Sequence, residues 1–236
     1  MYRNRSERLD AVPTLGSTLV GIADVGAPVF LDISRAAFGY NTGQVFRVSG
    51  AQADLTLRDV LVTGFYEAYR VLSADGDANV TIDRSTFFYW GFLGAEPVML
   101  GDRRFLIEGS IVMLTGRDYL RMRRADNTAV VRDLLIYQQQ LPPGPFFQPT
   151  TISRVHSTLD AGFVDAEGGD FRLARGSVAI DRYTPSFLDF EREPDLDHHA
   201  RGYDDGTVPN APGAIYDLGA YEQSDGVFRD GYEQDE

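Results

Sequence analysis

The sequence predicts an all-β protein, a single-stranded right-handed parallel β-helix of about six or more coils with an irregular C-terminal cap. Two observations predict this fold. A nine-residue pattern occurs six times at intervals of 24, 25, 25, 24 and 21 residues. β-branched and aromatic residues dominate it, and no helical periodicity of useful length accompanies it. The right-handed winding is expected from the usual rule for crossover connections between parallel strands.

Each copy of the pattern is an apolar segment interrupted by polar or charged residues. The copies are FLDISRAAF (30–38), DLTLRDVLV (54–62), NVTIDRSTF (79–87), RFLIEGSIV (104–112), TAVVRDLLI (128–136) and TTISRVHST (150–158). The intervals are measured between one apolar residue of each copy, and these anchors are Ile33, Leu57, Ile82, Ile107, Val131 and Ile152. Leucine-rich repeats share the period but need a Leu-x-x-Leu-x-Leu frame and a helical return, and propeller blades need about 40 residues or more.

In a β-helix, equivalent residues of successive coils lie about 4.8 Å apart and form columns. The anchors and the apolar columns that flank them are expected in the core. The first column after the anchors is Ser34, Arg58, Asp83, Glu108, Arg132 and Ser153, and the second is Arg35, Asp59, Arg84, Gly109, Asp133 and Arg154. Opposite charges mostly follow one another, with Asp83 and Glu108 as the like pair, so we expect a stacked charge ladder at a corner.

The chain divides by charge. It contains neither cysteine nor lysine, and its net charge is −13. Residues 1–159 hold 16 acidic residues and 16 arginines, whereas residues 160–236 hold 19 and 6. A neutral body with an acidic end makes nucleic acid and acidic membranes unsuitable partners. The missing thiols and amines exclude cysteine and lysine catalysis. No apolar run is long enough for a membrane span, and no signal peptide is visible.

Four parts are expected along the chain. Residues 1–27 form a lead-in or partial coil, 28–160 the β-helix coils, 161–223 the C-terminal cap and 224–236 an acidic tail. An open solenoid end exposes unpaired backbone that invites association between copies. We therefore expect the cap to close that end.

The cap carries the motifs DFRLARGSVAID (170–181), DLDHHAR (195–201) and DLGAYE (217–222). They resemble the C-terminal part of bacterial right-handed β-helix repeat proteins of the choice-of-anchor Q type. His198-His199 departs from that pattern, which has Gly after the second Asp. The final DGVFRDGYEQDE is similar to tails on exported proteins of some Gram-negative bacteria. These resemblances imply an extracellular or cell-surface protein.

Aromatic and arginine residues that follow several anchors are candidates for a carbohydrate-binding surface. Aromatic faces and amides can hold a sugar chain, and arginines can bind uronate or sulfate groups bidentately. In adjacent coils these residues would lie along one flank. The candidates are Tyr66, Tyr69, Tyr89, Trp90, Arg117, Tyr119, Arg121, Arg123, Tyr137 and Gln139.

Carboxylates offer candidates for a calcium site, because calcium prefers oxygen ligands. The candidate ligands are Asp195, Asp197, Asp204 and Asp205. The segment ADGDAN (74–79) resembles the start of a calcium loop but lacks the remaining EF-hand positions, so a turn is expected there.

Three functions fit these features. The preferred one is a non-catalytic exported or cell-surface protein that binds a polysaccharide or cell-surface glycan, or serves surface display. The alternative is a calcium-assisted polysaccharide lyase or glycosidase, or a fragment of one, with Arg121 or Arg123 as a base of strongly lowered pKa. The third is a structural subunit that stacks into a fibre through its N-terminal end.

Overall fold

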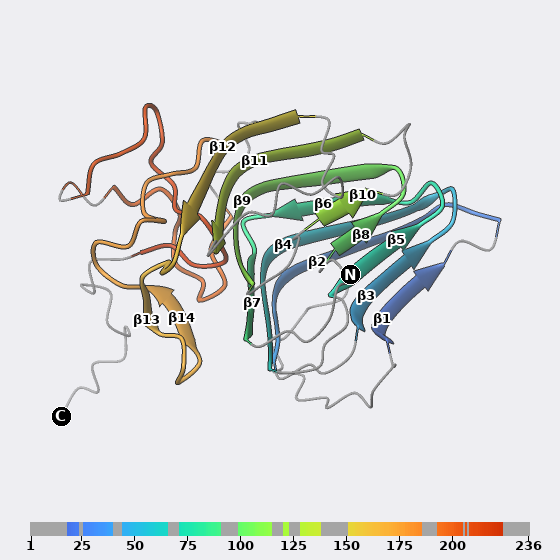
Figure 1. Cartoon of the computed structure of the whole chain (residues 1–236), viewed down its shortest axis with the longest axis horizontal. Helices are drawn as coiled ribbons and strands as arrows, with labels where there is room; N and C mark the ends of the chain where they lie inside the picture. Colours follow the sequence, from blue (N-terminus) through green and yellow to red (C-terminus); the bar gives the residue numbers. More distant parts are fainter. Residues whose placement is uncertain are drawn as a thin grey trace, which may run out of the picture.

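The computed structural model describes residues 18–23, 26–39, 44–65, 71–90, 99–114, 120–122, 128–137, 151–185, 193–204, 206 and 208–223. All regular elements in this part of the chain are β-strands, and no helix occurs among them. Parallel strands stack into a β-solenoid of about four turns (Figure 1). No helix that could cross a membrane is found within the described ranges.

Two parallel sheets form the body. The smaller sheet has the order β1-β3-β5-β8-β10, whose bounds are Thr18–Ala23, Gln44–Ser49, Leu72–Asp75, Met99–Gly101 and Leu120–Met122. The larger sheet has the order β12-β11-β9-β6-β4-β2, and β7 pairs with β4 and β9. Its strands are β2 Val29–Phe38, β4 Ala53–Phe65, β6 Asn79–Asp83, β7 Thr86–Trp90, β9 Arg104–Leu114, β11 Thr128–Tyr137 and β12 Thr151–Thr158.

The chain alternates between the two sheets, and this alternation produces the winding. From β2 to β11 it leaves the larger sheet, passes through β3, β5, β8 or β10, and returns each time. The step from β11 to β12 runs through residues 138–150, which lie outside the described residues.

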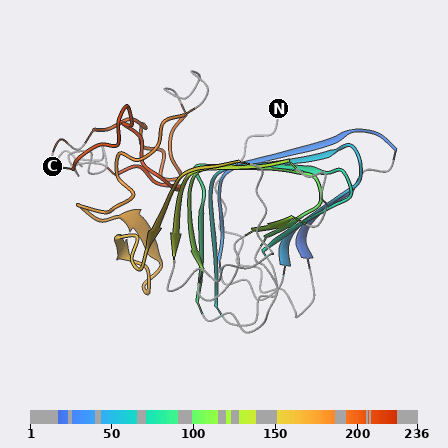
Figure 2. The same cartoon turned by 45° about the horizontal axis from the view of Figure 1, so that its top comes forward.

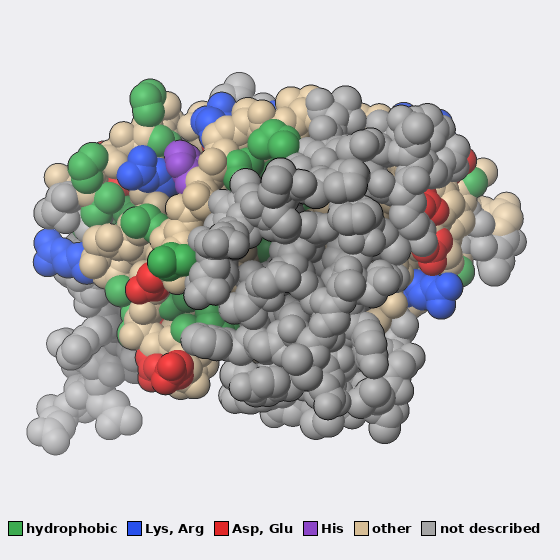
Figure 3. All heavy atoms as spheres, in the orientation of Figure 1, with side chains coloured by type: hydrophobic (Ala, Val, Ile, Leu, Met, Phe, Trp, Pro, Cys, Tyr) green, Lys and Arg blue, Asp and Glu red, His purple; other side chains and the backbone are tan. Residues whose placement is uncertain are grey.

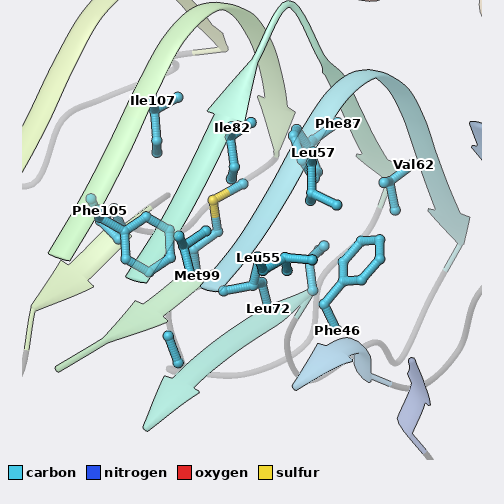
Figure 4. Close-up of a cluster of buried hydrophobic side chains, with 14 of the residues drawn as sticks. Phe46, Leu55, Leu57, Val62, Leu72, Ile82, Phe87, Met99, Phe105 and Ile107 are labelled. Carbon is cyan, nitrogen blue, oxygen red and sulfur yellow. The ribbon is translucent and has the colours of Figure 1, made fainter. Parts of the chain in front are cut away.

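The strand register confirms the predicted repeat. The six anchors are neighbours across the larger sheet, in the order Ile33, Leu57, Ile82, Ile107, Val131, Ile152. The flanking apolar columns pair in the same way, and most of their members belong to one buried cluster. Figure 4 shows side chains of this core converging from both sheets, among them Leu57, Ile82 and Ile107 from the larger sheet and Phe46 and Met99 from the smaller one.

The sequence predicts that all six anchors lie in the core, but the last anchor does not. Ile152 is 50% exposed, whereas Ile107 and Val131 are fully buried. Ile152 lies on β12, the edge strand of the larger sheet, so only one described strand packs beside it. A core column remains buried only where a further winding covers it.

Each winding of the larger sheet bends two residues after its anchor. The residues at the bend all have positive φ, namely Arg35 (50°), Asp59 (52°), Arg84 (44°), Gly109 (59°), Asp133 (49°) and Arg154 (50°). This left-handed conformation costs roughly 1–2 kcal/mol for a residue with a side chain, so surrounding contacts must maintain it. Figure 2 shows the long strands crossing the top of the body and turning downward at this corner. The second charged column of the sequence is therefore the corner itself.

The described residues between 161 and 223, here called the C-terminal clasp, pack against the side of the larger sheet. Their hairpin, β13 (Phe163–Asp165) and β14 (Asp170–Leu173), is antiparallel. A second buried cluster joins clasp residues such as Phe171, Ile180 and Leu218 to body residues on β4, β7, β9 and β11, namely Leu61, Phe88, Ile111, Met113 and Leu135. The sequence had led us to expect closure of the open end. The clasp instead covers a side, because the strands carry outward-facing apolar residues after the corner.

Candidate functional site

Charged side chains stack along the corner as the sequence predicted. Arg84 donates to Asp59 over 3.1 and 3.3 Å, and both side chains are almost fully buried, at 0% and 1% exposure. Arg132 donates to Glu108 over 2.6 Å, and Arg154 pairs with Asp133 through both of its donor nitrogens. These pairs, formed by the two columns that follow the anchors, constitute the corner ladder.

The C-terminal clasp extends the corner ladder sideways. Arg201 donates from Nη2 to Asp59 Oδ1 over 2.6 Å. Glu193 Oε2 accepts from Arg84 Nη2 over 2.7 Å. Asp59 therefore lies between one arginine of the body and one of the clasp. A buried charge is tolerated only with such partners, so each region satisfies the charges of the other.

Two backbone contacts fix the clasp at the corner. Gly219 N donates to Gly109 O over 2.7 Å, and Ala220 N donates to Thr86 Oγ1 over 3.0 Å. Gly219 has a φ of 92°, and a Cβ there would lie 2.6 Å from Thr86 Oγ1 and 2.8 Å from Ile111 Cδ1. Only glycine permits this approach. Glycine is likewise required at Gly109, where a Cβ would lie 2.8 Å from the ring of Tyr183.

Within the clasp, buried carboxylates bind backbone amides. Glu222 accepts from the amides of Gly202, Tyr203 and Asp217. Asp217 accepts from the amides of Asp181 and Gln223, and Asp195 accepts from those of His199 and Glu222. Most of these groups belong to the quoted C-terminal motifs. The structure shows that these carboxylates hold the loops of the clasp together.

Burial shifts the pKa values of these acids upward. It raises the pKa of Asp83 to about 7, an effect that the Arg84 charge only partly offsets. It raises the pKa of Glu222 to about 7 and moves the pKa values of Asp195 and Asp217 above their ordinary range. The pKa of the Tyr183 hydroxyl is raised by burial and by the Asp83 charge, so this group remains a donor. The carboxyl groups of Asp83 and Glu222 therefore titrate near neutral pH, well above the ordinary carboxyl range.

The predicted calcium ligands do not converge in the described residues. Asp195 is buried and accepts from backbone amides, Asp197 and Asp204 are exposed, and Asp205 lies outside the described residues. In the part of the chain that the structure describes, no three acidic or histidine side chains are placed to hold a metal ion.

The ADGDAN segment forms a turn, as expected, and its acids pair with arginines of the neighbouring windings. Arg47 lies 3.4 Å from Asp75, and Arg103 lies 3.2 Å from Asp77. These pairs are partly exposed, and we call them the turn ladder. The two acids of the supposed calcium loop thus have arginine partners.

The side chains of all ten carbohydrate-binding candidates lie outside the described residues, and the backbone is described for four of them. Tyr89 and Trp90 end β7, Tyr137 ends β11, and Arg121 lies in β10. Tyr89 is the register neighbour of Gly64 on β4 and of Leu114 on β9. Tyr66 comes directly after Phe65 in the sequence, and it lies outside the described residues, as do Tyr69, Arg117, Tyr119, Arg123 and Gln139. Because β4, β7, β9 and β11 are parallel neighbours, their carboxyl ends lie along one edge, whereas Arg121 belongs to the other sheet.

The sequence indicated the corner ladder but not its partners in the clasp. Arg201 and Tyr183 contact residues 142 and 100 positions away, and no periodicity links them to the repeat. The clasp also presents exposed apolar side chains, among them Val164, Val178 and Ile215. Figure 3 shows apolar side chains on the surface at its left, the side on which Figure 1 draws the clasp.

Comparison with known proteins gave no relationship from which a function could be transferred. The sequence matches no protein-family model, no curated protein and no solved structure. Function must therefore be argued from the site alone.

Proposed function

We propose that this chain is an exported or cell-surface right-handed β-helix protein of about six or more coils that binds carbohydrate without catalysing a reaction. The parallel register of β4, β7, β9 and β11 supports this proposal best. It aligns the strand ends at which the candidates Tyr89, Trp90 and Tyr137 occur. The candidates Tyr66, Tyr69, Arg117, Tyr119 and Gln139 follow such ends within a few residues of sequence. A linear glycan laid along the stack would meet one strand end after another.

The resemblance of the C-terminal motifs to choice-of-anchor Q β-helix proteins supports export and a right-handed winding of the β-helix. The roles of the motif residues are consistent with it, since Asp195, Arg201, Asp217, Gly219 and Glu222 all act in holding the clasp. Right-handedness also follows the general crossover rule.

The burial of the corner carboxyl groups supports a role without catalysis. A glycosidase needs two carboxyl groups that flank a substrate bond, and a lyase needs a base within reach of a substrate proton. The buried pair Asp83 and Glu108 is almost fully shielded, at 5% and 4% exposure, and Tyr183 lies against Asp83. No substrate reaches these carboxyl groups while the clasp is in place.

The register also argues against a fibre of stacked copies. The bend column begins with Arg35 on β2 and ends with Arg154 on β12. A second copy that continued the ladder in register would place these two arginines side by side. Like charges on directly opposite strand positions are destabilising.

Retention on immobilised acidic and neutral polysaccharides, followed by a glycan array, tests the proposal. Tyr66→Ala with Tyr119→Ala should abolish retention, and Arg117→Ala should weaken retention on acidic glycans. Tyr203→Ala is the matched control, since this exposed tyrosine lies in the clasp. Retention unchanged in the double variant, or no binding to any glycan, would refute the proposal. Release of an unsaturated, ultraviolet-absorbing product in the presence of calcium would favour the lyase instead.

A further inference from the structure

Among the carboxylates of the corner ladder and its neighbours, Asp83 has the longest distance to its arginine partner. Its Oδ2 lies 3.6 Å from Arg84 Nη2, but Arg84 is closer to Asp59 and to Glu193, at 3.1 and 2.7 Å. In the first column its neighbours are Arg58 and Glu108. Arg58 extends to Asp32 and Glu193, at 3.5 and 3.7 Å.

The other side of Asp83 meets a carboxylate and the clasp. Glu108 is buried beside it and is paired with Arg132 over 2.6 Å. Tyr183 of the clasp donates from its hydroxyl to Asp83 Oδ1 over 3.2 Å. The charged and titratable groups around Asp83 are thus Arg58, Asp59, Arg84, Glu108, Tyr183 and Glu193. Two buried acids share a site from which the clasp excludes water.

We propose that Asp83, Glu108 and Tyr183 form a pH-sensitive latch for the clasp, which stays closed while Asp83 holds a proton and loosens when that proton is lost. An ionised Asp83 would be buried beside the Glu108 carboxylate. Lifting Tyr183 away removes a hydrogen bond that favours the charged form of Asp83, but it admits water to both acids. Because burial is the larger of these two effects at Asp83, the charged state has a lower free energy in the open form. Opening would uncover the apolar strip on β4, β7, β9 and β11 that the clasp now covers.

The direction of the pH dependence follows from the linkage between proton binding and closure of the clasp. The pKa of Asp83 is about 7 with the clasp closed, and it returns toward its ordinary value near 4 in water. The closed form therefore binds the proton more tightly and is favoured most at low pH. The ratio of closed to open clasp falls about tenfold per pH unit between these two pKa values, and it is constant above the higher one. The carboxyl groups inside the clasp have raised pKa values as well, and they act in the same direction.

Hydrogen–deuterium exchange of the full chain at pH 5 and pH 8, corrected for intrinsic exchange, tests this latch. Peptides that cover 177–183 and 214–222 report on the clasp, and peptides from β4 and β9 report on the body. From pH 5 to pH 8, only the first two pH units lie below the pKa of about 7, where the ratio changes tenfold per unit. Protection of the clasp should therefore fall by up to about 100-fold relative to the body. Equal protection of the clasp at both pH values, or parallel loss in clasp and body, would overturn the proposal.

Variants isolate the latch from the other acids. Asp83→Asn keeps an acceptor for Tyr183 but cannot ionise, so the pH dependence should shrink by at least tenfold. Glu108→Gln removes the neighbouring charge and should shrink it as well, which provides a second test if Asp83→Asn does not fold. Asp170→Asn, in the exposed Asp170–Arg172 pair of the hairpin, is the control and should leave the dependence intact. A full dependence in both Asp83→Asn and Glu108→Gln would assign the effect elsewhere.

Discussion

The corner ladder and the turn ladder arise from the same kind of sequence pattern but meet very different surroundings. In the turn ladder, Arg47 and Asp75 are 60% and 31% exposed, and Arg103 and Asp77 are 43% and 33% exposed. In the corner ladder, Arg84 and Asp59 are 0% and 1% exposed, because the clasp covers them, whereas Arg154 on the edge strand is 53% exposed. Opposite charges one winding apart therefore do not define an energetic role. The covering segment decides whether a pair is a weak surface contact or a demanding buried one.

The strongest way to break this contrast is Arg84→Ala. It leaves Asp59 buried with one arginine fewer, and Glu193 loses the closer of its two arginines, since Arg58 lies 3.7 Å away. Removing one partner of a buried pair costs about 3–5 kcal/mol. Urea denaturation should show a loss of this size or a chain that does not fold. A loss under 1 kcal/mol would contradict the buried role of the corner ladder.

The cover itself can be disturbed through Gly219→Ala. The new Cβ would meet Thr86 Oγ1 and Ile111 at less than 3 Å and would also strain a φ of 92°. We expect a loss of about 2–3 kcal/mol and weaker protection of the clasp from proteolysis. Gly176→Ala is the matched control, because its φ is 83° but nothing lies within 4 Å of the added Cβ. Equal losses in the two variants would show that the close approach is unimportant.

The clasp can also be strengthened at one turn. His198 has a φ of 68° and is exposed, and it takes the place where the resembling pattern has glycine. His198→Gly should relieve left-handed strain, with a net gain of about 0.5–1 kcal/mol after the added flexibility of the unfolded chain. Thermal denaturation would measure this gain. A lower melting temperature would show that the imidazole stabilises the turn.

The smallest effect is expected for Arg103→Ala in the turn ladder. It removes the pair with Asp77, but both groups remain hydrated. The free energy of unfolding should fall by less than about 1 kcal/mol, and less still at high salt. A loss comparable to that of Arg84→Ala would remove the distinction between the two ladders.

The sequence predicts the body of this fold well because the repeat makes distant residues equivalent. Six anchors at near-constant spacing are sufficient to predict that Leu57 lies beside Ile82 and that Arg84 faces Asp59. The exposure of Ile152 was missed, since the pattern does not say which winding lies at an edge. The docking of Arg201 and Tyr183 could not be predicted, because the clasp carries no period that relates it to the body.

The long separations between clasp and corner have a consequence for synthesis. Asp59 and Thr86 leave the ribosome well over 100 residues before Arg201 and Ala220, their partners in the finished protein. Windings can add one after another on their neighbours as the chain grows, whereas the corner acids must remain hydrated until the clasp emerges. The clasp, which is translated after these windings, thus completes the burial of their corner residues.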